Sequence, residues 1–310
     1  MNYPKEIRIN EMVLRDGLQL EEKVLSVEEK HSIYDSLKKA GIQSFEFGSF
    51  VHPKLVPQMA NSGELFTEIA QDAEGIELIA LVPNLKGAQK AQELQVKEIN
   101  FVFSASDTHN MQNVRKTTEQ SIEELKEIHS FSKESGMKLN VTVATSFGCP
   151  FEGEIPESRV LSCLKELEPL QIHTVTLADT TGMANPKQVS ELMSKVVSEF
   201  PQLDLGLHFH NTRGMGLANI LAGIEAGVTR FDAALGGLGG CPFAPGATGN
   251  VCTEDVVHML HSMGMETNAD LSALLEASAS LEKLIGHPNK SYILKAGPYD
   301  RKYPVPELSN

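Results

Sequence analysis

Short apolar runs alternate with helical stretches along almost the whole chain, and this alternation constrains the fold more than any other feature. Eight runs rich in β-forming residues are separated by capped or amphipathic segments. They are residues 7–14, 43–47, 76–82, 99–103, 139–145, 173–178, 205–208 and 231–235. Strands that alternate with helices form parallel sheets. Eight such units without a clear linker favour a closed (β/α)8 TIM barrel over an open sheet.

Helix boundaries are marked by capping and stop residues. Ser26 and Glu29 have capping-box spacing and predict a helix that Gly41 ends. Residues 104–110 are polar and are interpreted as a loop, followed by a long helix near 118–134. These signals place the first polar loop residues at the ends of the predicted strands.

The length of 310 residues is ordinary for one barrel domain. We expect residues 1–310 to form a single domain, with the barrel over about 5–250. The remainder, 251–310, is expected to hold extra C-terminal helices at 253–263 and 271–284. The Pro-rich tail from Tyr292 is expected to pack on the surface or to fray.

The charge balance and the cysteines exclude several classes of partner. Lys and Arg number 27 against 41 Asp and Glu, and the net charge of −14 argues against nucleic acid or an anionic membrane as partner. No apolar run approaches the roughly 18 residues that span a membrane. The polar N-terminus is unlike a signal peptide, and the four cysteines form no Cys-x-x-Cys pair. We therefore expect a cytoplasmic protein.

His208 and His210 follow the seventh run. Alternate residues of a strand share a face, so both imidazoles can bind one metal ion. Ordinary hydrogen bonds at the end of a buried strand are the alternative. Asp16 and Asn250 follow the first and eighth runs, and the ends of barrel strands meet on one rim. This mixed nitrogen and oxygen set favours Mg²⁺ or Mn²⁺ over structural zinc.

Three further charged residues lie at strand ends, namely Arg15, Glu46 and Asp179. Glu46 stands between two phenylalanines, and burial of its carboxylate without a partner would be costly. We therefore predict an Arg15–Glu46 pair inside the barrel mouth. The alternative for Arg15 is a plain surface ion pair with Asp16.

Cys241 lies in the glycine-rich segment 236–242 that follows the eighth run. Glycines allow sharp backbone turns, and a thiol on such a segment can close over a site and exchange a proton. A small residue tolerated in a tight loop is the alternative. The other cysteines are expected to be buried thiols, and they are Cys149, Cys163 and Cys252.

Together these motifs resemble the 3-hydroxy-3-methylglutaryl-CoA lyase family, from about residue 5 to 285. The matching segments are 15–19 (Arg-Asp-Gly-Leu-Gln), 49–54, 178–180, 208–210, 239–246 and 249–250. Four residues depart from the family pattern: the pair Val13-Leu14, Glu22 in place of a lysine, and Asn211 in place of an aspartate. The departures leave a related branched 3-hydroxyacyl-CoA open as the substrate.

The resemblance implies metal-dependent cleavage of a small acyl-CoA to acetyl-CoA and acetoacetate, as in leucine degradation and ketone body formation. It implies a homodimer. It implies four metal ligands (Asp16, His208, His210, Asn250), five catalytic residues (Arg15, Glu46, Asp179, Cys241, Glu254) and substrate contacts from Arg15 and Gln19. Two other hypotheses are a condensing enzyme or aldolase of the same superfamily and a barrel that binds metal and ligand without catalysis.

Overall fold

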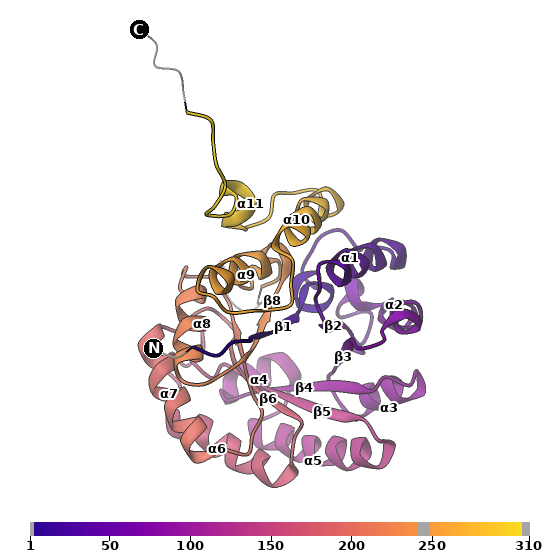
Figure 1. The fold of residues 1–310 in the computed structure, drawn as a ribbon. Helices are drawn as coiled ribbons and strands as arrows, with labels where there is room; N and C mark the ends of the chain where they lie inside the picture. The colour runs from indigo at the N-terminus through magenta and orange to yellow at the C-terminus, as the bar shows by residue number, and fades with distance from the viewer. Residues whose placement is uncertain (1–2, 241–248, 306–310) are drawn as a thin grey trace.

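The computed structural model describes residues 3–240 and 249–305 and confirms the TIM barrel (Figure 1). Eight parallel strands close in sequence order, with β8 paired to β1. The strands are β1 Arg8–Glu11, β2 Ser44–Ser49, β3 Glu77–Val82, β4 Glu98–Ser104, β5 Lys138–Ala144, β6 Thr174–Asp179, β7 Leu205–Phe209 and β8 Arg230–Ala233.

Helices surround the barrel as an outer layer (Figure 1). In chain order they are α1 Val27–Lys39, α2 Ser62–Ile69, α3 Leu85–Glu93, α4 Asp107–Val114, α5 Thr118–Ser135, α6 Glu157–Leu167, α7 Pro186–Glu199, α8 Gly216–Glu225, α9 Thr253–Ser262, α10 Leu271–Ile285 and α11 Tyr292–Ala296. The predicted capping box of α1 is present, since the Ser26 hydroxyl accepts from the Glu29 N–H and the Glu29 carboxylate accepts from the Ser26 N–H. Within the described residues, no helix has the length and apolar character that crossing a bilayer requires.

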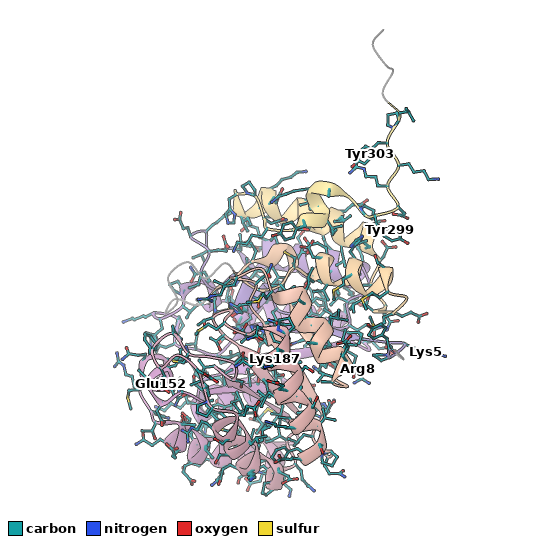
Figure 2. The ribbon with its side chains drawn as sticks, turned by 90° about the vertical axis from the view of Figure 1, so that its left-hand side faces the viewer. Lys5, Arg8, Glu152, Lys187, Tyr299 and Tyr303 are labelled. Atoms are coloured by element: carbon teal, nitrogen blue, oxygen red, sulfur yellow. The ribbon has the colours of Figure 1, made fainter. Side chains whose placement is uncertain are left out.

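Three local predictions differ from the structure. The first strand ends at Glu11, and the residues that follow form a π-helical turn. The predicted loop 104–110 holds the start of α4, because the Ser106 hydroxyl accepts from the His109 N–H and caps a helix there. The predicted tail begins with α11, whose first N–H groups donate to the Asp255 carboxylate. Beyond α11 the chain leads away from the barrel and carries Tyr299 and Tyr303 (Figure 2).

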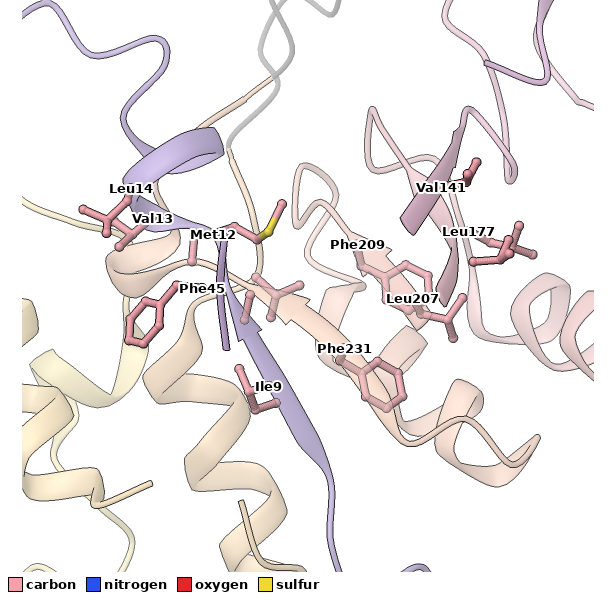
Figure 3. Close-up of a cluster of buried hydrophobic side chains, with 14 of the residues drawn as sticks. Ile9, Met12, Val13, Leu14, Phe45, Val141, Leu177, Leu207, Phe209 and Phe231 are labelled. Atoms are coloured by element: carbon pink, nitrogen blue, oxygen red, sulfur yellow. The ribbon is translucent and has the colours of Figure 1, made fainter. Parts of the chain in front are cut away.

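The hydrophobic core lies between the strands and the helices. Phe45, Leu207 and Phe231 are strand side chains of this core, and each is fully buried (Figure 3). The inside of the barrel is polar instead. It is lined by Asn10, Glu46, Ile79, Asn100, Asn140, Thr142, Thr174, Thr176, Arg230 and Asp232. Buried polar groups need partners, so this interior has to be a hydrogen-bonded network.

Candidate active site

A π-helical turn, η1 Val13–Gly17, follows β1 and carries Arg15 and Asp16. The Gly17 N–H donates to the Met12 carbonyl at 3.0 Å, and the Leu18 N–H donates to the Val13 carbonyl at 2.9 Å. In a strand, neighbouring side chains point to opposite faces. On this turn the side chains of Arg15 and Asp16 instead contact each other in the protein interior. π-Helical turns are frequent at functional sites.

Three predicted metal ligands come together at the barrel mouth. Asp16, His208 and His210 are buried, and one ligand atom from each lies within 4.8 Å of the others. The two imidazole rings have their centroids 5.0 Å apart. One carboxylate and two imidazoles on one spot are a donor set that divalent cations bind.

Asn250 completes the group. Its side-chain NH2 donates to Asp16 Oδ2 at 2.6 Å and to the Leu238 carbonyl at 2.9 Å. Its Oδ1 is buried and has no hydrogen-bond partner among the described residues. An unpaired buried oxygen beside a carboxylate and two imidazoles is what a further metal ligand would leave when no ion is present, so the residues fit a divalent cation.

Arg15 lies between two carboxylates, which confirms the predicted pair with Glu46. Its Nη1 donates to Asp16 Oδ1 at 2.5 Å, and its Nε donates to Glu46 Oε2. The other oxygen of Glu46 accepts from Asn100 Nδ2 at 2.9 Å. These two carboxylates therefore hold the guanidinium next to the group of Asp16, His208 and His210.

Burial and charge act in opposite directions on these acids. Burial alone would raise the pKa of Asp16, but Arg15 and His210 outweigh it and hold that pKa well below its ordinary value. For Glu46, burial outweighs the attraction of Arg15 and raises the pKa. Burial raises the pKa of Asp179 to about 6, despite a backbone hydrogen bond from Met183. Asp16 therefore stays ionised, as a metal ligand has to be, whereas Asp179 can exchange a proton near neutral pH.

The other predicted site residues occupy different places. Gln19 Nε2 donates to Asp16 Oδ1 at 2.8 Å. Asp179 ends β6, and its Oδ2 has no hydrogen-bond partner among the described residues. Glu254 lies on α9 and accepts from the Gly236 N–H at 3.1 Å and from the Ser278 hydroxyl at 2.5 Å. Glu254 thus supports the glycine-rich segment, and Cys241 lies outside the described residues.

Sequence reasoning missed Asp232 and Glu11. Asp232 Oδ2 lies 3.1 Å from His208 Nδ1. Glu11 accepts from the backbone N–H groups of Val13 and Leu235, both at 2.9 Å. Each is a charged residue inside a predicted apolar strand. The same signal identified Glu46.

Comparison with known proteins agrees with this geometry. The HMGL-like family model matches residues 6–281. The hydroxymethylglutaryl-CoA lyase of Bacillus subtilis is 38% identical, with 93% of this chain and 96% of that protein covered. The (R)-citramalyl-CoA lyase of Chloroflexus aurantiacus is 37% identical, with 94% of this chain and 95% of that protein covered.

A solved structure of an HMG-CoA lyase is also similar to this chain. An HMG-CoA lyase from Acinetobacter baumannii, in complex with coenzyme A and 3-methylmalate, superposes with a TM-score of 0.93 at 46% identity and covers 99% of this chain and 100% of its own. The family model matches most of the chain, and the relatives match it over nearly its full length. The chain therefore belongs to the HMGL-like family of carbon–carbon lyases.

Proposed function

We propose that this chain is a divalent-metal-dependent lyase that cleaves 3-hydroxy-3-methylglutaryl-CoA to acetyl-CoA and acetoacetate. The observation that carries the proposal is the buried group of Asp16, His208 and His210, with the Arg15 guanidinium bonded to its carboxylate. The names of the relatives support this substrate, because hydroxymethylglutaryl-CoA lyases align over almost the whole chain.

Asp16, His208, His210 and the unpaired Oδ1 of Asn250 would hold Mg²⁺ or Mn²⁺. When bound, such an ion supplies Lewis acidity that lowers the pKa of a substrate hydroxyl and orients the substrate. Gln19 donates to the same carboxylate and is proposed to contact the substrate at the edge of this group.

Cleavage of the carbon–carbon bond needs a base for the tertiary hydroxyl. We assign this role to Asp179, because its Oδ2 is buried and unpaired among the described residues and its pKa is raised to about 6. A base with a pKa near the working pH is effective. As the hydroxyl loses its proton and becomes the ketone of acetoacetate, the electron pair of the breaking bond passes to the thioester as an enolate.

The enolate needs a positive group at its oxygen and a proton at its carbon. Arg15 is proposed to face the oxygen, held in place by Glu46 and Asp16. Fixed donors of this kind stabilise developing charge effectively, because they need no reorganisation during the reaction. Cys241 is proposed to deliver the proton that completes acetyl-CoA, and Glu254 to support the segment on which that cysteine lies.

The test is product release from metal-stripped protein reloaded with Mg²⁺ or Mn²⁺. The substrates are 3-hydroxy-3-methylglutaryl-CoA, citramalyl-CoA and unbranched 3-hydroxybutyryl-CoA. We expect acetoacetate release that chelation abolishes, with the highest kcat/KM for the first thioester. A higher kcat/KM for citramalyl-CoA would show that the substrate assignment is wrong.

The condensing alternative is tested with the same protein. A condensing enzyme would release free CoA from acetyl-CoA and a 2-oxo acid, and we expect no such release. Absence of metal-dependent product from every thioester would overturn the lyase proposal.

A further inference from the structure

We infer that Asp232 is a positioning residue that holds the His208 imidazole in the tautomer protonated on Nδ1, so that Nε2 is its metal-binding atom. The inference rests on the proposed function in one respect, since it requires that a divalent cation binds at Asp16, His208 and His210. It concerns a residue outside that ligand group.

The barrel register brings Asp232 to the same level as two partners. Strand β8 pairs Asp232 with His208 of β7 on one side and with Asn10 of β1 on the other. Asp232 Oδ2 lies 3.1 Å from His208 Nδ1, and Asp232 Oδ1 accepts from Asn10 Nδ2 at 2.9 Å. Each carboxylate oxygen therefore has its own buried partner, and the carboxylate cannot turn without losing one of them.

Arg230 and Ser44 set the direction of these hydrogen bonds. A guanidinium can only donate. Arg230 Nη2 lies 3.5 Å from Ser44 Oγ, so the serine oxygen accepts there and its own proton is free to donate to Asn10 Oδ1 at 3.0 Å.

The orientation of Asn10 follows from that bond. With its Oδ1 occupied as an acceptor, Asn10 turns its NH2 toward Asp232. Asp232 Oδ1 is thus an acceptor, and a carboxylate oxygen such as Oδ2 is likewise the acceptor that suits an imidazole N–H. The proton shared with His208 belongs to the imidazole Nδ1, and the lone pair of the ring is on Nε2.

His210 has no equivalent support. Its Nδ1 has no hydrogen-bond partner among the described residues, and its Nε2 lies 3.6 Å from Asp16 Oδ2. Within the described part of the chain the two imidazoles therefore differ, because only the Nδ1 of His208 lies within hydrogen-bond distance of a carboxylate. Such outer partners orient metal-binding histidines and raise their affinity for the ion.

The test is Asp232→Asn in the full chain. The asparagine keeps the shape and can still accept from Asn10, but its NH2 then faces His208 Nδ1. The imidazole has to accept there, which moves its proton to Nε2, the metal-binding atom. We expect Mn²⁺ affinity, measured by titration calorimetry or from the electron paramagnetic resonance signal of free Mn²⁺, to fall about 10- to 100-fold.

The matched control is Asp204→Asn. This change is chemically the same, and Asp204 accepts from Thr174 Oγ1 at 3.2 Å just before β7 begins. We expect it to leave Mn²⁺ affinity unchanged. Wild-type Mn²⁺ affinity in a folded Asp232→Asn protein would overturn the inference.

A second measurement does not depend on the folding of the variant. In the metal-free wild-type chain at alkaline pH, where imidazoles are neutral, ¹⁵N-edited NMR reports the tautomer of each histidine. The His208 signals are assigned by their loss in His208→Gln, and we expect the Nδ1-protonated form. An Nε2-protonated His208 would overturn the inference. Because neither measurement uses turnover, a failed lyase assay would overturn the proposed function alone.

Discussion

Asp16 is the residue on which most of the candidate site depends. Its Oδ1 accepts from Arg15 and Gln19, and its Oδ2 accepts from Asn250 and lies near His210. Each partner has its own role in the proposed reaction, so the carboxylate couples the metal ligands to the guanidinium. Arg15 and His210 hold its pKa well below the ordinary value, so this proposed ligand stays ionised at moderately acid pH.

Cys241 gives the prediction at the scale of one residue. In Cys241→Ser a hydroxyl replaces the thiol and is a much weaker acid, so proton delivery should fail. We expect kcat to fall about 100-fold or more, since a positioned proton donor contributes at least that much. Mn²⁺ affinity should stay unchanged, because Cys241 is not one of the proposed ligands.

Cys163→Ala is the matched control for this change. Cys163 is buried on α6, and burial raises the pKa of its thiol to about 11, so it stays protonated. Its replacement should leave kcat unchanged. Full activity of Cys241→Ser would show that the assigned role of Cys241 is wrong.

Among the elements, η1 decides the geometry of the site. The apolar residues Met12, Val13 and Leu14 are fully buried, as they would be in a strand, and the sequence pattern does not distinguish the two. Hydrogen bonds to Glu11 stabilise the turn at this position. Its Oε1 accepts the Val13 and Leu235 N–H groups, and its Oε2 accepts the Thr253 hydroxyl at 2.6 Å. One carboxylate thus joins η1 to the segment after β8 and to α9.

Ionisation of Glu11 lowers the free energy of unfolding. Burial raises its pKa from 4.5 to about 7. A group whose folded pKa lies above its unfolded value stabilises the protein at low pH, and that stability is lost as pH rises from about 4.5 to 7. Glu11→Gln keeps the acceptor for both N–H groups and cannot ionise. We expect it to match wild type in free energy of unfolding at pH 4.5 and to exceed it by about 3 kcal/mol at pH 8.

Urea unfolding at both pH values measures this difference. Glu11→Ala is the control, because it removes the hydrogen bonds as well and should be less stable than wild type at both. Equal stability of wild type and Glu11→Gln at pH 8 would contradict the raised pKa.

At the scale of the whole molecule, the C-terminal helices hold the base of the glycine-rich segment. The Gly236 N–H donates to Glu254, which also accepts from Ser278 of α10. The Gly236 carbonyl accepts from the Lys290 N–H at 3.0 Å, just before α11. The residues after the barrel are thus part of the surroundings of the candidate active site.

Gly236→Ala tests this connection. Gly236 has φ of +67°, and an added Cβ would lie 2.8 Å from Asn289 Cβ. We expect a loss of about 2 kcal/mol or more in the free energy of unfolding, from backbone strain and this clash. Turnover should fall, while Mn²⁺ affinity should be retained.

Gly75→Ala is the matched control for that variant. Gly75 has φ of +75°, and its added Cβ would meet nothing within 4 Å. Its free energy of unfolding should fall only by the cost of the backbone strain, about 1–2 kcal/mol, and its turnover should be unchanged. Thermal unfolding and the lyase assay measure both variants, and equal losses in the two would show that contact with Asn289 contributes nothing.

The barrel could be predicted from the sequence because its signal repeats eight times, and the His208–His210 pair because strand alternation fixes its geometry. Asp232 could not be assigned a partner, since the register between β7, β8 and β1 appears only when the barrel closes. The start of α4 was missed because Ser106 caps it without a capping-box acid three residues later. Glu254 was predicted from the resemblance, but its contact with Gly236 depends on how α9 packs.

Asn250 is attached to the barrel frame, and this has a consequence for protein engineering. It forms an isolated bridge with His210, and the backbones of its neighbours Gly249 and Val251 bond to Asn211 and Phe209. This proposed ligand is therefore anchored by backbone bonds to the end of β7 and to the residues that follow it. Replacing 241–248 with the corresponding segment of a relative should therefore leave Asn250 in register with His210, so that this segment can be varied while the proposed metal ligands are kept.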